Sequence, residues 1–185
     1  MLIRLCLWLL CAGGCLSATG QTYERTTLLT KMPALKNEVA GGFTVFVFLS
    51  PECPLCKNYS VVLTQLSHQY AGQVRFAGIV PGKAYSLKDI RRFRKHYAIP
   101  FAIHRDRDRA VSIYLAATVT PEVLLINNAG TALYRGAIDN WVVNLGKKRQ
   151  AATEHYLADA IRQSLQQQPV TVSYTPPVGC LINDF

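Results

Sequence analysis

Apolar and polar residues follow each other in blocks along this chain of 185 residues, and the blocks differ in their period. Residues 43–49 (FTVFVFL) form the first block and are rich in β-branched and aromatic side chains, which predicts a strand buried on both faces. Beyond this block, apolar positions recur every three or four residues, which predicts an amphipathic helix that ends near Ala71-Gly72. These positions are Leu55, Tyr59, Val62, Leu63, Leu66 and Tyr70.

The rest of the pattern continues the alternation of strands and helices. Ser86 and Asp89 have the spacing of a capping box, which indicates the start of a basic helix. The predicted elements are a strand at 74–80, this basic helix to about 97, a short strand at 101–103, a helix at 109–117, the two strands of a hairpin at 123–127 and 131–134, and a closing helix at 151–167. This order predicts a three-layer α/β/α sandwich with a central mixed sheet.

The length and pattern indicate one domain, over residues 43–167, with a segment on either side. Residues 19–42 have no strong period, contain Pro33 and end in Gly41-Gly42, so we expect a loosely packed N-terminal arm with room for a short hairpin. Residues 168–185 form a C-terminal tail that carries Cys180.

The first 18 residues have the pattern of a secretory signal peptide: one positive charge, an apolar run and then small residues. Two processing sites fit this segment. Ala12-Gly13-Gly14-Cys15 is a loose match to a bacterial lipobox, which would make Cys15 a lipidated, membrane-anchored N-terminus, whereas cleavage after Ala18 would release a soluble protein. Both predict a protein exported to the periplasm or cell envelope, where thiols are oxidised unless a partner reduces them.

The formal net charge of +9 does not indicate a nucleic-acid-binding protein. The basic residues gather in three separate groups, at 88–95, 105–109 and 147–149, without the interleaved aromatic residues of a nucleic-acid platform. We expect a solvated basic surface and no nucleic-acid partner.

The candidate chemistry lies in Cys53-Pro54-Leu55-Cys56, directly after the first predicted strand. Cys53 falls at the start of the following helix, where free N–H groups and the helix dipole favour a thiolate, and Cys56 lies one turn on along the same face. A zinc site needs four ligands and no second pair of matching spacing is present, while so short a loop gives a structural disulfide little stabilisation. Redox chemistry is therefore the favoured interpretation.

Several motifs in the same order resemble the thioredoxin-like superfamily, in particular its exported redoxin branch, related to alkyl hydroperoxide reductase and thiol-specific antioxidant proteins. The matching segments are 48–56 (FLSPECPLC), 119–123 (VTPEV), 128–130 (NAG) and 134–136 (YRG), and 177–182 (PVGCLI) is similar to the Gly-Cys ending of secreted redoxin-domain proteins. The resemblance implies a thioredoxin-like sandwich with a redoxin-type strand-helix insertion.

The resemblance also implies a role for individual residues. Cys53 would attack a substrate disulfide, Cys56 would resolve the mixed disulfide, and Pro121 would be a cis-proline facing the pair. The backbone of Thr120 would pair with a substrate peptide, with Pro54 and Leu55 as further substrate contacts. No cofactor is implied, and the expected partners are protein thiols or disulfides and an upstream thiol-disulfide donor or acceptor of electrons.

Three departures from the relatives keep other functions open. Glu52 stands where thioredoxins have Trp, and a carboxylate there disfavours the thiolate of Cys53. Peroxiredoxins have Pro where this chain has Phe46, although Ser50 matches their hydroxyl position, so a peroxidase remains an alternative. Copper-delivery relatives space their cysteines one residue further apart, which leaves a copper-binding protein as a second alternative.

Other candidate residues have ordinary structural interpretations beside functional ones. Cys180 is a spare thiol, a second resolving cysteine or a metal ligand with the cysteine pair. Glu122 is a satisfied acid at the end of a strand, the favoured interpretation, or a proton acceptor for Cys56. Trp141 fills a gap beneath its loop or lines a substrate groove. The four histidines, His68, His96, His104 and His155, lack the spacing of metal ligands, and the sequence predicts no metal site.

Overall fold

A computed structural model describes residues 20–182, and its centre is the apolar strand β1 (Phe43–Phe48). Strands β2 (Val74–Pro81) and β3 (Ala102–Asp106) continue the sheet on one side of β1 in parallel, and β5 (Glu122–Ile126) and β6 (Ala132–Gly136) continue it on the other side in antiparallel directions. The strand order is β3-β2-β1-β5-β6. The predicted mixed sheet is therefore confirmed.

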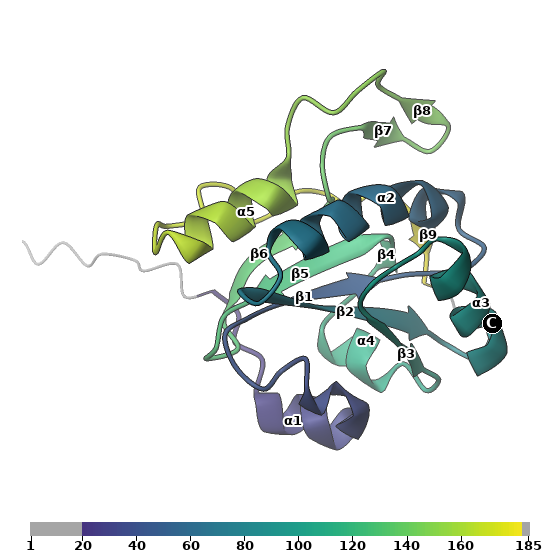
Figure 1. The fold of residues 1–185 in the computed structure, drawn as a ribbon, viewed down its shortest axis with the longest axis horizontal. Helices are drawn as coiled ribbons and strands as arrows, with labels where there is room; N and C mark the ends of the chain where they lie inside the picture. The colour runs from purple at the N-terminus through teal and green to yellow at the C-terminus, as the bar shows by residue number, and fades with distance from the viewer. Residues whose placement is uncertain (1–19, 183–185) are drawn as a thin grey trace, which may run out of the picture.

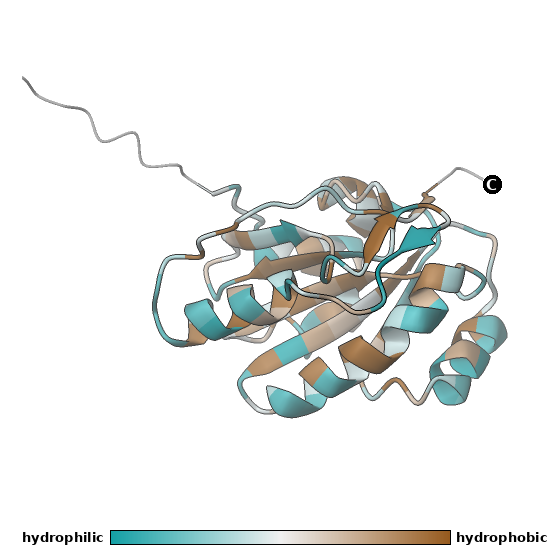
Figure 2. Cartoon of the chain, turned by 90° about the horizontal axis from the view of Figure 1, so that it is seen from above, coloured by the Kyte–Doolittle hydropathy of each residue, from teal (hydrophilic) through white to brown (hydrophobic). Residues whose placement is uncertain are grey.

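Helices cover both faces of this sheet (Figure 1). Helices α2 (Pro54–Gln69), α3 (Leu87–His96) and α5 (Tyr156–Leu165) pack on one face, and α1 (Arg25–Lys31) and α4 (Ala110–Tyr114) pack on the other. Strand β1 is buried on both sides because its side chains alternate: Val45 and Val47 join the first core, whereas Phe46 and Phe48 join the second. In Figure 2 the central strands are mostly hydrophobic, whereas the helices beside them contain both hydrophobic and hydrophilic residues.

Helix α3 and strand β3 lie between β2 and α4, where the resemblance implies a redoxin-type insertion. The capping box at the start of α3 is present, since Ser86 Oγ accepts from Asp89 N and the Asp89 carboxylate accepts from Ser86 N. Together with the sheet order, this insertion gives the protein a thioredoxin-like α/β/α fold of the redoxin type.

The expectation of a loose arm with a hairpin before β1 is wrong. Within residues 20–42 the chain forms α1 and a 3₁₀ turn at Pro33–Lys36, and their side chains Leu28 and Leu35 are fully buried in the second core. The helix and the 3₁₀ turn are too short for their apolar residues to show a helical period in the sequence. The packing of Leu28 and Leu35 into the core therefore determines the structure of this segment.

Two helices are shorter than predicted. The backbone enters the left-handed region at Arg109 (φ 58°) and Ala116 (φ 52°), which limits α4 to Ala110–Tyr114. Helix α5 starts at Tyr156 rather than near 151 because Asn140 Oδ1 accepts hydrogen bonds from the N–H groups of Thr153 and Glu154 and holds these residues in a loop.

Two small antiparallel pairs were not predicted. Strands β7 (Val142–Asn144) and β8 (Lys147–Lys148) form a hairpin before α5, and β4 (Val119–Thr120) pairs with β9 (Cys180–Leu181) in the tail. In the described part of the chain, 20–182, no helix is both long and apolar enough to cross a lipid bilayer. The predicted signal peptide and the lipidation site Cys15 lie outside the described residues.

Candidate active site

The two cysteines of the Cys53–Cys56 motif lie at the N-terminal end of α2, directly beyond the C-terminal end of β1. Cys53 is the N-cap residue and Pro54 occupies the first helical position, where its missing N–H leaves no helical hydrogen bond unmade. Cys53 is 3% exposed and Cys56 is fully buried. The local fold thus places one thiol at the surface of the core and the other beneath it.

The cis-proline expected from the resemblance is present and lies beside the first thiol. The peptide bond between Thr120 and Pro121 is cis, and Cys53 Sγ lies 3.2 Å from the carbonyl oxygen of Thr120. Residues separated by 67 positions in the chain are therefore in contact at one site. The catalytic role of Pro121 remains a prediction.

The surroundings of Cys53 favour its thiolate. Hydrogen bonding from the Cys56 thiol lowers the pKa of Cys53 most, burial raises it, and the Cys180 thiol and the N–H groups of Cys56 and Leu55 lower it further, to about 5. A cysteine with this pKa is almost fully ionised at neutral pH, and the thiolate is the nucleophilic form.

The environment of Cys56 has the opposite effect. Burial raises the pKa of Cys56 well above its ordinary value, and the hydrogen bond to Cys53 and the negative charge of Cys53 raise it further. The N–H of Ser50 donates to Cys56 Sγ at 3.4 Å and opposes these effects only in part. Cys56 is a protonated thiol while Cys53 is ionised.

A third thiol completes the site. Cys180 of β9 is partly exposed, and its Sγ lies 2.7 Å from Cys53 Sγ, although 127 positions separate the two residues. Burial, together with the hydrogen bond and charge of Cys53, raises the pKa of Cys180 to about 11. Of the three interpretations considered for Cys180, an isolated spare thiol does not fit this contact.

The side chain of Glu52 is directed at Lys57 rather than at the thiols. Its Oε2 lies 2.9 Å from Lys57 Nζ, and both groups are accessible to solvent. This pairing offsets the carboxylate charge that disfavours a thiolate, and Glu52 does not feature among the groups that shift the pKa of Cys53. The replacement of the usual Trp therefore leaves Cys53 with a depressed pKa.

Neither of the two positions compared with the peroxidase motif, Ser50 and Phe46, has a side chain hydrogen-bonded to Cys53. The hydroxyl of Ser50 donates to Tyr85 Oη at 3.1 Å, and Phe46 is fully buried on the opposite face of the sheet. The hydroxyl that would assist peroxide reduction is thus bound to a tyrosine instead.

Glu122 behaves as a satisfied acid at a strand end. Its Oε2 accepts from the N–H and hydroxyl of Thr118 and, at 3.4 Å, from the N–H of Val119, while Oε1 accepts from Arg135 Nη1. Both carboxylate oxygens are engaged, which favours the structural interpretation over a proton acceptor for Cys56.

A cleft of about 470 Å³ opens next to the thiols, between the start of α2 and the β7–β8 hairpin. Pro54, Leu55 and Cys180 line one side, and Leu145 and Lys148 are among the hairpin residues on the other. Leu145 is 68% exposed. Sequence reasoning missed this hairpin; the Leu145-Gly146 turn between Val142-Val143 and Lys147-Lys148 was the signal for it.

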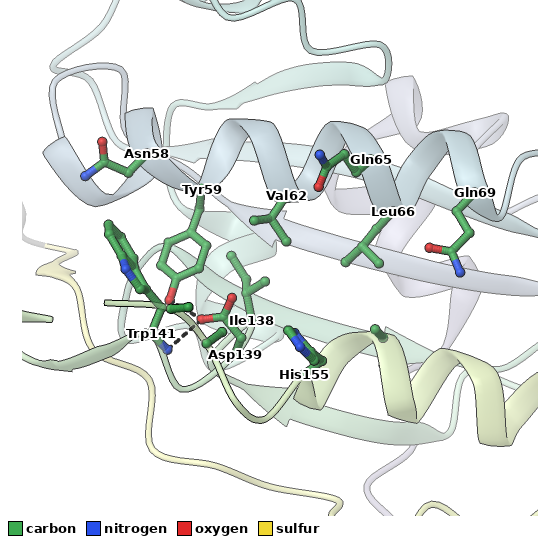
Figure 3. Close-up of a pocket in the computed structure, with 13 residues that line it drawn as sticks. Asn58, Tyr59, Val62, Gln65, Leu66, Gln69, Ile138, Asp139, Trp141 and His155 are labelled. Carbon is green, nitrogen blue, oxygen red and sulfur yellow. Dashed lines mark hydrogen bonds between the residues drawn. The ribbon is translucent and has the colours of Figure 1, made fainter. Parts of the chain in front are cut away.

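Another cleft, of about 560 Å³, lies between α2 and α5 and contains no cysteine (Figure 3). Its floor carries a buried Tyr59, whose hydroxyl donates to Asp139 Oδ1 at 2.6 Å, and the same oxygen accepts from the backbone N–H of Trp141. The Trp141 ring contacts Tyr59 edge-on, and Lys148 Nζ lies 5.0 Å from its centre. Trp141 packs over the core and lines this cleft at the same time.

Three of the four histidines lie in ordinary structural settings. His104 Nε2 lies 3.0 Å from Glu38 Oε1, His96 contacts the ring of Tyr97, and His155 lines the α2–α5 cleft. Across residues 20–182, no group of three or more His, Cys, Asp or Glu side chains is arranged to hold a metal ion.

No protein-family model matches this chain, and a comparison with curated proteins gives no match. Among solved structures, it resembles a hypothetical protein from Sinorhizobium meliloti (22% identity, TM-score 0.73, 82% of this chain and 84% of that chain). It also resembles an uncharacterized conserved protein from Geobacillus kaustophilus (22% identity, TM-score 0.67, 77% of each chain). At these identities the comparisons show a shared fold. The sheet order and the cis-proline beside the cysteine motif make this fold thioredoxin-like.

Proposed function

We propose that this protein is a thiol-disulfide oxidoreductase. The observation that carries the proposal is Cys53: a cysteine at a helix N-terminus, with a pKa of about 5, in contact with the carbonyl that precedes a cis-proline. A structural cysteine gains nothing from a depressed pKa, whereas a nucleophile at neutral pH requires one.

The two cysteines divide the reaction between them. The Cys53 thiolate attacks one sulfur of a substrate disulfide, and the other substrate sulfur leaves as a thiolate. The Cys56 thiol then attacks Cys53 Sγ, its proton passes to the departing substrate sulfur, and the Cys53–Cys56 disulfide remains. The substrate has gained two electrons and the cysteine pair has lost them; an external dithiol restores the pair.

Substrate proteins would bind along the surface that surrounds Cys53. The Thr120 backbone offers an edge for an extended peptide, and the cleft between Pro54, Leu55 and the β7–β8 hairpin offers an apolar floor with Lys147 and Lys148 at its rim. This arrangement favours unfolded or flexible segments that contain a disulfide over compact protein surfaces.

The compartment follows from the sequence rather than from the fold. The signal-like first 18 residues support export, with Cys15 as a lipid anchor or Ala18 as the cleavage point. Outside the cytoplasm the pair would exchange electrons with another thiol-disulfide protein, because no soluble glutathione pool keeps thiols reduced there.

The test is the reduction of insulin disulfides with dithiothreitol as electron donor. The wild-type protein should accelerate the reaction, and Cys53→Ser should reduce the rate to that of dithiothreitol alone. Val61→Ala, on the exposed face of α2 away from the thiols, is the matched control and should keep the wild-type rate. Full activity in Cys53→Ser, or none in the wild type, would overturn the assignment.

A further inference from the structure

The C-terminal tail is fastened along the sheet before it reaches the thiols. Arg135 of β6 exchanges backbone hydrogen bonds with the tail, from Arg135 N to Ser173 O at 2.9 Å and from Thr175 N to Arg135 O at 3.1 Å. The Thr175 side chain is buried and also bonds to Tyr134 Oη. The tail therefore arrives at the active site on a defined path.

The end of this tail occupies the edge expected to bind substrate. In the antiparallel pair of β4 and β9, Thr120 is paired with Cys180 and Val119 with Leu181. The Ile182 N–H donates to Thr118 O at 3.1 Å and extends the pairing by one step. An extended peptide segment thus already lies beside the cis-proline, and it belongs to the same chain.

The approach of the tail is so close that only glycine fits at one position. A Cβ atom on Gly179 would lie 2.3 Å from the Thr120 carbonyl oxygen and 3.2 Å from Pro121 N. Because both obstacles are backbone atoms, a side chain at this position would force the tail away from the loop. The contact is specific to the segment that carries Cys180.

This segment also presents a sulfur to Cys53, as a substrate would. Cys180 Sγ is 2.7 Å from Cys53 Sγ and approaches it from a separate strand. Cys56, the other thiol that bonds to Cys53, belongs to the same helix as Cys53. Backbone pairing at Thr120 and a sulfur against the nucleophile are the two features that a bound disulfide substrate must have.

We propose that strand β9 is a tethered substrate mimic and that Cys180 is a second exchange partner for Cys53. This inference rests on the proposed function and extends it. Bound substrate must displace β9, and Cys180 can release a mixed disulfide when Cys56 has not yet done so.

The exchange balances without any further reactant. Starting from Cys53 joined to a substrate sulfur, Cys180 Sγ attacks Cys53 Sγ, the Cys53–substrate bond breaks, and the Cys180 proton passes to the released substrate thiolate. Cys56 then attacks Cys53 Sγ, the Cys53–Cys180 bond breaks, and the Cys56 proton passes to Cys180. The end product is the Cys53–Cys56 disulfide with Cys180 again a thiol.

The decisive experiment follows the adduct of Cys53 with glutathione. Reduced Cys56→Ser and Cys56→Ser/Cys180→Ser proteins are treated with glutathione disulfide, quenched in acid and mapped by non-reducing peptide mass spectrometry. We expect a Cys53–Cys180 disulfide in the single variant and a lasting Cys53–glutathione adduct in the double variant. An adduct of equal yield and lifetime in both variants would overturn the role of Cys180.

The substrate-mimic role has its own test. Gly179→Ala should weaken the closed state of the tail and lower the KM for insulin, by about threefold if the tail covers two thirds of the molecules, with kcat little changed. Gly72→Ala is the control, because it lies after α2, has a positive φ of 78° and meets no atom within 4 Å. A KM for Gly179→Ala equal to that of the control would contradict the mimic.

These outcomes separate the inference from the function on which it rests. If the wild-type protein does not reduce insulin but Cys53–Cys180 forms in Cys56→Ser, the oxidoreductase assignment fails while the exchange stands. If the wild-type protein reduces insulin and the two variants hold equal adducts, the oxidoreductase assignment stands and the exchange role of Cys180 fails. If the double variant forms no adduct at all, Cys53 is not a nucleophile and both proposals fail.

Discussion

Glu122 and Arg135 form an ion pair across the neighbouring strands β5 and β6, with 2.9 Å between Oε1 and Nη1 and with only 2% of the Glu122 side chain exposed. Arg135 also donates to the Ala116 carbonyl and to Tyr23 Oη. The pair therefore connects the loop before the cis-proline to the end of α4 and to the N-terminal segment, and it fixes the position of the backbone edge at Thr120.

We predict that Glu122→Gln destabilises the protein by about 3 kcal/mol, because it leaves the largely buried guanidinium without a counter-charge. Urea denaturation followed by circular dichroism measures this change. The control is Asp159→Asn, which removes an exposed ion pair with Arg162 and should cost less than about 1 kcal/mol. Equal losses of stability in the two variants would show that the buried ion pair of Glu122 with Arg135 contributes no more than an exposed one.

The alkylation of Cys53 should depend on pH with a midpoint near 5. Only the thiolate reacts with iodoacetamide, so the rate should fall as the pH drops below the pKa of about 5 and stay level from pH 6 to 8. Cys56 and Cys180, with raised pKa values, should react only at much higher pH. Stopped-flow or mass-spectrometric rates between pH 3 and 9 measure the profile, and a single rise near pH 9 would contradict the assignment.

The redox potential of the Cys53–Cys56 pair should be less negative than that of thioredoxin, about −270 mV, and should lie on the side of the strong oxidant DsbA, at about −120 mV. The reason is that a depressed pKa stabilises the reduced form at neutral pH relative to the disulfide. Equilibration with glutathione buffers measures the potential. Cys180→Ala removes a hydrogen bond to the thiolate and should make the potential more negative; no change would show that this bond is weak.

Gly136→Ala should release the tail from β6. A Cβ atom there would lie 1.9 Å from the Thr175 carbonyl oxygen, and φ is 134°, so the substitution adds a clash to the backbone strain. We expect faster hydrogen exchange at the amides of 173–182 and a lower unfolding temperature. Gly146→Ala is the control: its φ of 81° gives backbone strain, but no atom lies within 4 Å of the added Cβ. It should leave the hydrogen exchange of the tail amides unchanged.

The central sheet and the cysteine pair could be predicted because their signals are local. A run of β-branched and aromatic residues defines β1, and the motif that follows it gives the position of both thiols. The cis geometry at Pro121 came from the resemblance, not from the pattern of residues.

The contacts that complete the site could not be predicted because they join distant segments. Nothing near Cys180 in the sequence indicates that it pairs with Thr120, and a lone cysteine far along the chain fits several interpretations. Likewise, Leu28 and Leu35 show no period of their own, and only the second core explains their burial. Tertiary contacts determine the pairing of Cys180 and the burial of Leu28 and Leu35, and the local sequence gives no signal for either.

The position of β9 also has a temporal consequence. A chain that leaves the ribosome or an export channel N-terminus first displays Cys53 and then Pro121 well before Cys180 emerges. For that interval Cys53 has its helix but lacks the contact with β9, so its thiol is more accessible to foreign thiols and disulfides than in the folded protein. The pairing of β9 with β4, which brings Cys180 to Cys53, is thus the last of these contacts to form.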